Sequence, residues 1–364
     1  MTALFSRSVW LLTACLFGLC GCLHTETRLQ SDDDKERDKD YADIRTIGDV
    51  TSVANATPIH VSGVGIVFGL EGTGSNPTAD GYRSFLEDYL RKRGVDNVKE
   101  MLASPDTSLV LVSALIPPGA RKDDPIDVEV TLPPHSKTTS LKGGYLKECI
   151  LYNYDTTKHL SPDSKGGNRL VSGHPLAKAW GPLLVGFSGG DDKTRLQYGR
   201  IWGGGRCAID RPVYLVLNRE QKRAPVAIKV AERINETMQG GIGSQLNTLA
   251  EPKSDQLVVL KVAPQYRLNL PRYLRVVRMI PLQEGQALVN YRRRLTDDLL
   301  DPERTVVSAL RLEAHGTGSV DVFKAGLEQE EALVRFCSAE ALAYQGDPAC
   351  GELLAKMVEE QPAQ

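Results

Sequence analysis

The sequence predicts an α+β protein, with a strand-rich core in several parts followed by a small all-α region at the carboxyl end. Three observations support this fold class. Short apolar runs punctuated by glycine recur from Ile44 to about residue 280 and are typical of strands joined by tight turns. Helical patterns interrupt these runs without the regular β–α–β alternation of a doubly wound sheet. From Pro302 onward, stretches rich in Ala, Leu and Glu replace the strand signals.

Length and composition exclude several classes of protein. The 364 residues, of which 41% are hydrophobic and 25% charged, are enough for two or three cores and exclude a mostly disordered chain. The 44 Lys and Arg residues nearly balance 46 Asp and Glu residues, giving a formal charge of −2. A chain without net positive charge has no global field to hold nucleic acid, so no nucleic-acid partner is predicted.

The pattern of the amino-terminal residues predicts a targeting segment. Arg7 precedes an apolar run, Val9 to Leu19, which ends at small and cysteine residues, in the order of a signal peptide. Leu19, Gly21 and Cys22 resemble the lipobox at which bacteria cleave and diacylate a cysteine. We therefore predict a lipoprotein signal peptide over 1–21 and lipid attachment at Cys22, with an ordinary signal peptide as the alternative. Leu23, where an Asp would favour retention, favours anchoring in the outer membrane.

Residues 22–43 are predicted to be a charged, flexible tether. The stretch from Leu23 to Asp43 has few apolar side chains and includes the run Ser31 to Asp40, so it offers little surface to bury. No His or Cys lies at ligand spacing from these acids, and a calcium site is the less favoured interpretation.

Residues 44–151 are predicted to form the first α+β domain. An amphipathic helix begins after Asp80 as N-cap and ends at Gly94. The run 109–116 is long and apolar enough for a buried strand, and 126–130 alternates as a strand with one wet face. The other predicted strands are 44–50, 61–68 and one that follows the turn at 141–146.

A loop-rich stretch over 152–175 predicts a domain boundary or a surface excursion, and a second α+β region follows over 176–284. Val226, Val230 and Ile234 lie four residues apart and predict a helix over 225–238. The strands predicted in this region are 180–186, 198–205, 213–217, 256–262 and 273–280.

Residues 285–364 are predicted to form a helical cap, with helices over 303–315, 319–328, 331–345 and 349–360. Two copies align at a period of about 30 residues, and the segment from Glu331 to Pro348 resembles a short HEAT-type repeat. A plain helical subdomain is the alternative. Two repeats are too few for a free solenoid, so the cap must rest on the preceding domain or on a partner. The aligned positions are Val306, Ala309, Leu312 and Gly316 against Phe336, Ala339, Leu342 and Gly346.

The motifs that would carry chemistry are incomplete. Gly63, Gly65 and Gly69 approach a dinucleotide fingerprint, but the third glycine is one residue late and no helix follows. The segment Gly72-Thr73-Gly74 lacks the Lys of a phosphate loop, and the six His residues lack zinc-site spacing. We therefore predict structural glycines, no catalytic residues, no cofactor and no metal.

Four cysteines follow Cys22 in the sequence: Cys149, Cys207, Cys337 and Cys350. In an oxidising compartment Cys337 and Cys350, which flank one helical hairpin, are the favoured local disulfide. A pair between Cys149 and Cys207 needs adjacent strands, and free buried thiols are the third possibility.

Several segments in order resemble one family. The stretch from Gly63 to Gly74, which includes Gly69, Gly72 and Thr73, resembles the family segment "GYGLVVGLNGTG". Residues 120–130 resemble "ARPGDRIDVTV", and 140–146, with Gly143 and Gly144, resemble "SLRGGTLL". Over roughly residues 43–281 the chain is similar to the bacterial flagellar P-ring protein family.

This resemblance implies a non-enzymatic structural subunit. Copies of the chain would form a closed ring, a bushing around the flagellar rod in the periplasm near peptidoglycan, with rod and L-ring proteins as partners and motility as the role. Arg91, Lys92 and Arg93 could face an acidic rod, although cations at a helix C-terminus are commonly just solvated. Because the anchor and the cap depart from the family, the alternative is a non-flagellar envelope lipoprotein that binds proteins through the cap.

Overall fold

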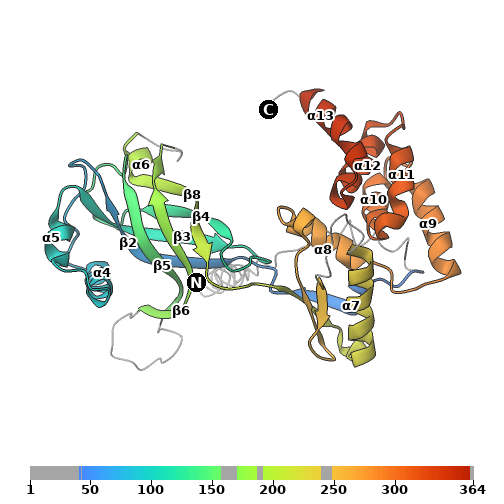
Figure 1. The fold of residues 1–364 in the computed structure, drawn as a ribbon, viewed down its shortest axis with the longest axis horizontal. Helices are drawn as coiled ribbons and strands as arrows, with labels where there is room; N and C mark the ends of the chain where they lie inside the picture. The colour runs from blue at the N-terminus through green and yellow to red at the C-terminus, as the bar shows by residue number, and fades with distance from the viewer. Residues whose placement is uncertain (1–40, 42, 157–169, 187–191, 239–247, 361–364) are drawn as a thin grey trace, which may run out of the picture. The chain divides into compact units, whose positions relative to one another are not determined.

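The computed structural model describes residues 41, 43–156, 170–186, 192–238 and 248–360 (Figure 1). The predicted signal peptide, Cys22 and nearly all of the tether lie outside the described residues. The described residues confirm the predicted fold class, a strand-rich α+β core with a helical carboxyl-terminal region. Among the described residues, no helix is both long enough and apolar enough to cross a membrane.

Seven strands form a sheet that closes into a barrel. The strand order is β4-β3-β2-β5-β6-β8-β7, every neighbouring pair is antiparallel, and a further pairing of β4 with β8 joins the sheet to itself. The strands are β2 (Ile59–Phe68), β3 (Thr107–Ile116), β4 (Pro125–Thr131), β5 (Tyr145–Thr156), β6 (Leu170–Pro182), β7 (Leu184–Val185) and β8 (Tyr198–Cys207).

Side-chain alternation builds the barrel interior. On β4, Ile126 and Val128 point into the core while Asp127 lies outside, as the predicted alternation requires. β3 has apolar side chains on both faces. Helices cover Leu109 on the outer face, whereas Leu115, further along the strand, is uncovered and 56% exposed. The covering helices, which Figure 1 shows beside the barrel, are α4 (Gly81–Lys92) and α5 (Val98–Ala103); a short α6 (Asp192–Gln197) precedes β8.

Helix α4 has the predicted ends. The Asp80 carboxylate accepts a hydrogen bond from the backbone N–H of Arg83 at 3.0 Å, so it caps the first turn. Gly94 has a φ of +73°, the left-handed conformation that ends helices.

A second, four-stranded antiparallel sheet has the order β1-β9-β11-β10. Its strands are β1 (Thr51–Ala54), β9 (Val213–Leu217), β10 (Ala250–Pro252) and β11 (Leu257–Leu260). Its buried side chains form one core with helices α3 (Ile47–Val50), α7 (Ala224–Met238) and α8 (Leu270–Met279). Two 3₁₀ turns, η3 (Arg219–Gln221) and η4 (Pro264–Tyr266), complete this part.

The helical cap begins at Gln286, with a helix ahead of the four that were predicted. The cap consists of α9 (Gln286–Asp298), α10 (Thr305–Glu313), η5 (Gly316–Ser319), α11 (Val320–Gly326), α12 (Ala332–Gln345), η6 (Pro348–Cys350) and α13 (Gly351–Glu360).

Positions 30 residues apart in the cap have matching environments. Leu312 and Leu342 are fully buried, whereas Val306 and Phe336 are 45% and 43% exposed. Gly316 and Gly346 both have positive φ, +63° and +76°. The match supports the predicted repeat, with α10 and α12 as equivalent helices.

The prediction of a strand over 44–50 is wrong, because the only β-pairing there is an isolated bridge between Thr46 and Pro281. Residues 47–50 form the helical turn α3, and β1 starts only at Thr51. The Asp49 carboxylate accepts hydrogen bonds from the backbone N–H of Thr46 at 2.7 Å and from its hydroxyl at 2.9 Å. This local capping pair closes the turn.

The predicted strand over 273–280 is a helix, α8. The Asn269 side chain accepts from the backbone N–H of Arg272 and caps its first turn. Buried positions 273, 274, 276 and 277 follow a helical spacing, not a period of two.

The predicted boundary at 152–175 does not separate domains. β5 and β6 pair across it from Tyr145 opposite Pro182 to Thr156 opposite Leu170, and both belong to the barrel. The barrel strands β2 to β8 follow one another in sequence, whereas the second sheet takes β1 from before the barrel and β9 to β11 from after it.

Candidate functional site

The glycines of the predicted turns meet at one end of the barrel. Gly69 and Gly143 face each other, both with positive φ, and a Cβ on either would lie 3.7 Å from the carbonyl oxygen of the other. The Thr73 hydroxyl lies 2.8 Å from the carbonyl oxygens of Leu70 and Ser140 and joins the two turns.

The backbone of this loop is already hydrogen-bonded within the chain. The N–H of Gly72 donates to the Asp106 carboxylate and that of Gly74 to the carbonyl of Pro105, both at 2.8 Å. These N–H groups are not available to cradle a phosphate. A Cβ on Gly74 would lie 2.2 Å from the Thr107 carbonyl oxygen. The contacts support a structural role for this loop.

The remaining motif glycines allow close approach of neighbouring chain. A Cβ on Gly63 would lie 2.5 Å from the Ile150 carbonyl oxygen of β5, and one on Gly65 would lie 3.0 Å from Leu146. A Cβ on Gly144 would lie 2.5 Å from Val67. At Gly63 only glycine leaves room for β5 to lie this close to β2.

The predicted basic cluster is largely neutralised within the chain. Arg91 pairs with Glu87 at 3.1 Å and Asp88 at 3.6 Å. Arg93 pairs with Glu148 of β5 at 2.5 Å. Among the described residues only Lys92 of the three has no carboxylate partner, so the cluster offers one uncompensated cation to a partner.

The structure carries Cys337 and Cys350 as free thiols, not as the predicted disulfide. The Cys350 thiol donates to the carbonyl of Asp347 at 3.0 Å. Burial raises the pKa of Cys337 to about 11, which disfavours the thiolate needed to form a disulfide. Cys149 and Cys207 are also buried and free. The described residues contain no group of three or more His, Cys, Asp or Glu side chains that could hold a metal ion.

Comparison with known proteins identifies the family. A model of the family described as flagellar P-ring protein matches residues 46–292, which include the whole barrel and the second sheet. The chain belongs to the flagellar P-ring protein family. The match ends within α9, so the P-ring family region excludes α10 to α13 of the cap.

Curated P-ring proteins resemble this chain at modest identity. The flagellar P-ring protein of Oleidesulfovibrio alaskensis is 28% identical over 250 residues, 65% of this chain and 60% of the relative. That of Helicobacter pylori is 25% identical over 277 residues, 74% of this chain and 69% of the relative. That of Thermotoga maritima is 36% identical over 109 residues, 30% and 32% of the two chains. The chain thus spans about 60% of the length of the Oleidesulfovibrio protein.

A buried ionic cluster fixes the cap to the P-ring family region. Arg272 of α8 pairs with Glu313 of α10 at 2.6 Å and with Glu340 of α12 at 2.6 Å. The Tyr266 hydroxyl donates to Glu313 at 2.5 Å, and the Tyr266 ring stacks on that of Tyr344 with centroids 4.7 Å apart. The cap therefore rests on the preceding domain, one of the two options that its small size predicts.

A single buried arginine ties together the segments between the barrel and the second sheet of the P-ring family region. Arg211 is 3% exposed and donates to the carbonyls of Ile116 at 2.8 Å and Thr57 at 3.0 Å. It also donates to the Asn55 side chain at 2.7 Å. Sequence reasoning missed Arg211, because an arginine in a short loop carries no signal of burial.

A cavity that sequence reasoning also missed lies between α4, β2 and β5, next to the Arg93–Glu148 pair. Its volume is about 230 Å³. Tyr89 lines it, and the Tyr89 hydroxyl is buried without a hydrogen-bond partner among the described residues. In the sequence Tyr89 is one more apolar position of an amphipathic helix, and nothing marks its hydroxyl as special.

Proposed function

We propose that this chain is a structural subunit of a flagellar basal-body P-ring, a closed ring of copies that surrounds the rod in the periplasm near peptidoglycan. The observation that carries the proposal is the family match, which covers the barrel and the second sheet completely. Rod and L-ring proteins are the partners that such a ring would meet. The role is mechanical support of motility and needs no catalytic residue.

The barrel wall offers a surface suited to contacts between copies. A ring that closes by rotation uses two different faces of each subunit, and apolar side chains in such faces stabilise the contact. Trp180 on β6 and Trp202 on the neighbouring β8 are 38% and 61% exposed. Leu184 of β7, also exposed, lies beside β8.

Loss of the protein is expected to abolish swimming and to remove the periplasmic ring from purified basal bodies. Electron microscopy of basal bodies from a deletion strain measures the ring directly, and a soft-agar assay measures motility. Complementation with the wild-type chain should restore both, whereas Trp202→Ser should restore them less well than Ile228→Ser, which removes an exposed apolar side chain from α7. Intact rings and normal swimming in the deletion strain would refute the proposal.

The alternative, a non-flagellar lipoprotein that binds proteins through its cap, has weaker support. The family match concerns the part of the chain outside α10 to α13. Within the cap, Glu313 and Glu340 are directed to Arg272 of the family region rather than to a partner.

We also propose that Cys22 carries lipid and anchors the chain to the outer membrane. The support is the order of Arg7, the apolar run and the Leu19–Cys22 segment. A palmitate analogue fed to cells is expected to label the wild-type protein and Cys20→Ala, but not Cys22→Ala. Cys20→Ala is a matched control because it removes a cysteine two residues away. Equal labelling of all three proteins would rule out Cys22 as the attachment site.

A further inference from the structure

The cavity beneath the C-terminal half of α4 is lined mainly by apolar side chains. Val64 and Ile66 of β2 form its floor, and Leu86 and Leu90 of α4 form one wall, with Val95 beyond the helix end. Its volume of about 230 Å³ exceeds the ~150 Å³ of an engineered apolar cavity that binds benzene. The cavity is therefore large enough for one compact apolar group.

The Tyr89 hydroxyl is the unusual polar group of this cavity. It is buried and has no hydrogen-bond partner among the described residues, although a buried hydroxyl normally has one. Burial raises the pKa of Tyr89 to about 12, so the hydroxyl stays neutral and keeps a proton to donate. An organic group with an acceptor oxygen would satisfy the hydroxyl, and its apolar part would fill the space against the aliphatic side chains better than water does.

The cavity rim carries a net positive charge. Arg93 and Glu148 neutralise each other at 2.5 Å. Lys147, also on the rim, has no carboxylate partner among the described residues, and its ammonium group lies 5.7 Å from the centre of the Phe68 ring. An anionic head at the rim would meet this uncompensated cation.

From these three features we propose that the cavity between α4, β2 and β5 binds a small carboxylic acid with a compact apolar body. The apolar body fills the space against Ile66 and Leu86. The carboxylate accepts a hydrogen bond from the Tyr89 hydroxyl and pairs with Lys147. This site is separate from the exposed tryptophans suggested for ring contacts and does not depend on ring assembly.

Titration of the purified chain with phenylacetate, followed by NMR shifts of the ligand and of α4 amides, tests the proposal. We expect saturable binding with a Kd of about 1 mM or tighter, as suits a ligand of this size. Phenylacetamide, which has the same shape without charge, should bind several-fold more weakly, and acetate, which lacks the apolar body, should not bind measurably.

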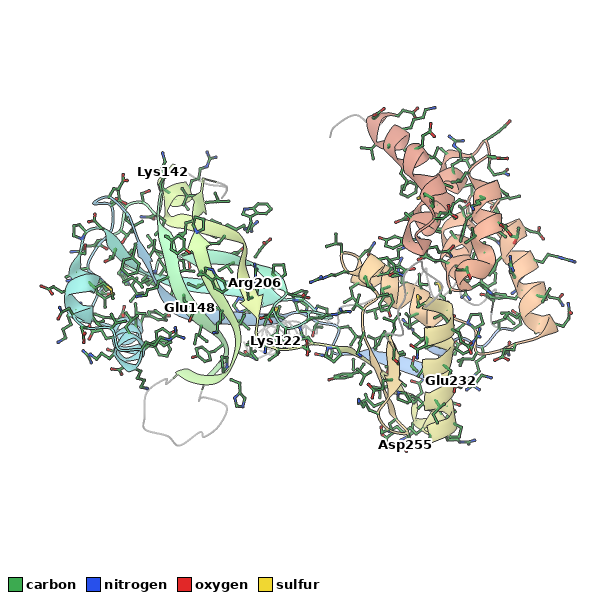
Figure 2. All side chains as sticks on the ribbon, in the orientation of Figure 1. Lys122, Lys142, Glu148, Arg206, Glu232 and Asp255 are labelled. Carbon is green, nitrogen blue, oxygen red and sulfur yellow. The ribbon has the colours of Figure 1, made fainter. Side chains whose placement is uncertain are left out.

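Three variants identify the site. Tyr89→Phe should weaken phenylacetate binding about tenfold, since it removes one hydrogen bond, and should not lower the melting temperature because the hydroxyl has no partner in the free chain. Lys147→Gln should weaken binding of phenylacetate but not of phenylacetamide. Lys142→Gln is the matched control, because Lys142 is an exposed lysine before β5 and is well separated from Glu148 in Figure 2. This variant should bind both ligands with wild-type affinity.

Two results would overturn the proposal. One is the absence of saturable shifts in the wild-type chain at about ten times the expected Kd. The other is equal affinity of wild type, Tyr89→Phe and Lys147→Gln for phenylacetate. Phenylacetate would then be an adventitious additive only, bound outside the proposed site. Both are measured on the soluble chain before assembly, so they are independent of whether rings form in cells.

Discussion

Replacing Arg272 with methionine is expected to lower the free energy of unfolding by about 3–5 kcal/mol, the usual cost of removing one partner from a buried ion pair. Glu313 is almost fully buried and takes its charge-assisted hydrogen bonds from Arg272 and Tyr266. Without the guanidinium, its carboxylate is left in a low-dielectric site with a single donor. The apolar body of methionine keeps most of the packing, so the loss measures the charge.

Urea unfolding of wild type, Arg272→Met and the control Arg91→Met measures this effect. Arg91 also pairs with two carboxylates, but it is about half exposed, so its replacement should cost less than about 1 kcal/mol. The double variant Arg272→Met/Glu313→Gln should recover part of the loss, because it no longer buries an unpaired charge. Equal unfolding midpoints for Arg272→Met and Arg91→Met would contradict the assigned role.

The stability that the Arg272→Met variant loses relative to wild type should also depend on pH, in a direction that the pKa of Glu313 sets. Burial raises the pKa of Glu313, and Arg272 opposes that shift in the wild-type chain. In the variant the opposing charge is gone, and the folded-state pKa rises further above the unfolded value. An acid with a raised pKa favours the folded state below its unfolded pKa, and this contribution is lost as pH rises through the folded pKa. The stability difference from wild type should therefore narrow as pH falls from 8 toward 5.

Local signals were sufficient to predict much of this fold. The helix capped by Asp80 and ended by Gly94 is present as α4, and the alternation over 126–130 appears as β4 with one wet face. Each of these patterns is set by residues within a few positions of one another. The 30-residue period of the cap is visible because each copy carries its own helical pattern, and it recurs in the burial of Leu312 and Leu342.

The errors arose where local patterns compete or where distant residues decide. The apolar run 273–280 contains two adjacent valines and looks like a strand, although Asn269 and the spacing of Tyr273 and Val277 are those of a capped helix. Closure of the barrel depends on β4 pairing with β8, and Glu129 lies opposite Arg200, 71 residues away. No local signal encodes such a pairing, so the sequence leaves a domain boundary and a surface excursion open over 152–175, where β5 and β6 pair.

The site residues also divide into those that a local sequence pattern predicts and those that only the tertiary structure brings together. The glycines between Gly63 and Gly74 were recognised from their spacing, and their contacts are structural. The ion pair of Arg93 with Glu148 has no local signal, because 55 residues separate the partners, so the sequence predicts cations that face a rod or are solvated. The Tyr89 cavity depends on how α4 lies against β2 and β5, which is a tertiary feature without a sequence pattern.

Arg211→Met is expected to destabilise the chain by about 3 kcal/mol or more, since hydrogen bonds to a charged group contribute ~1.5–3 kcal/mol each and this guanidinium makes three. The variant leaves the carbonyls of Ile116 and Thr57 without this donor in a buried site. The backbone of Arg211 also exchanges hydrogen bonds with Gly119 and Ala120. Its side chain thus stabilises the place where the chain leaves the barrel for β9 and where β1 leads into β2.

Because Arg211 joins these segments, its loss should also reduce cooperativity. If the barrel and the second sheet unfold independently in the variant, urea unfolding should show a lower m-value or two transitions in place of one. The matched control is Arg206→Met, which removes an arginine that also donates to carbonyls, those of Gly203 and Gly205, but from the barrel surface. We expect the control to retain a single transition and to lose less than about 1 kcal/mol. A single wild-type-like transition in Arg211→Met would show that other contacts, such as the Arg267–Asp124 pair, are enough to couple the two sheets.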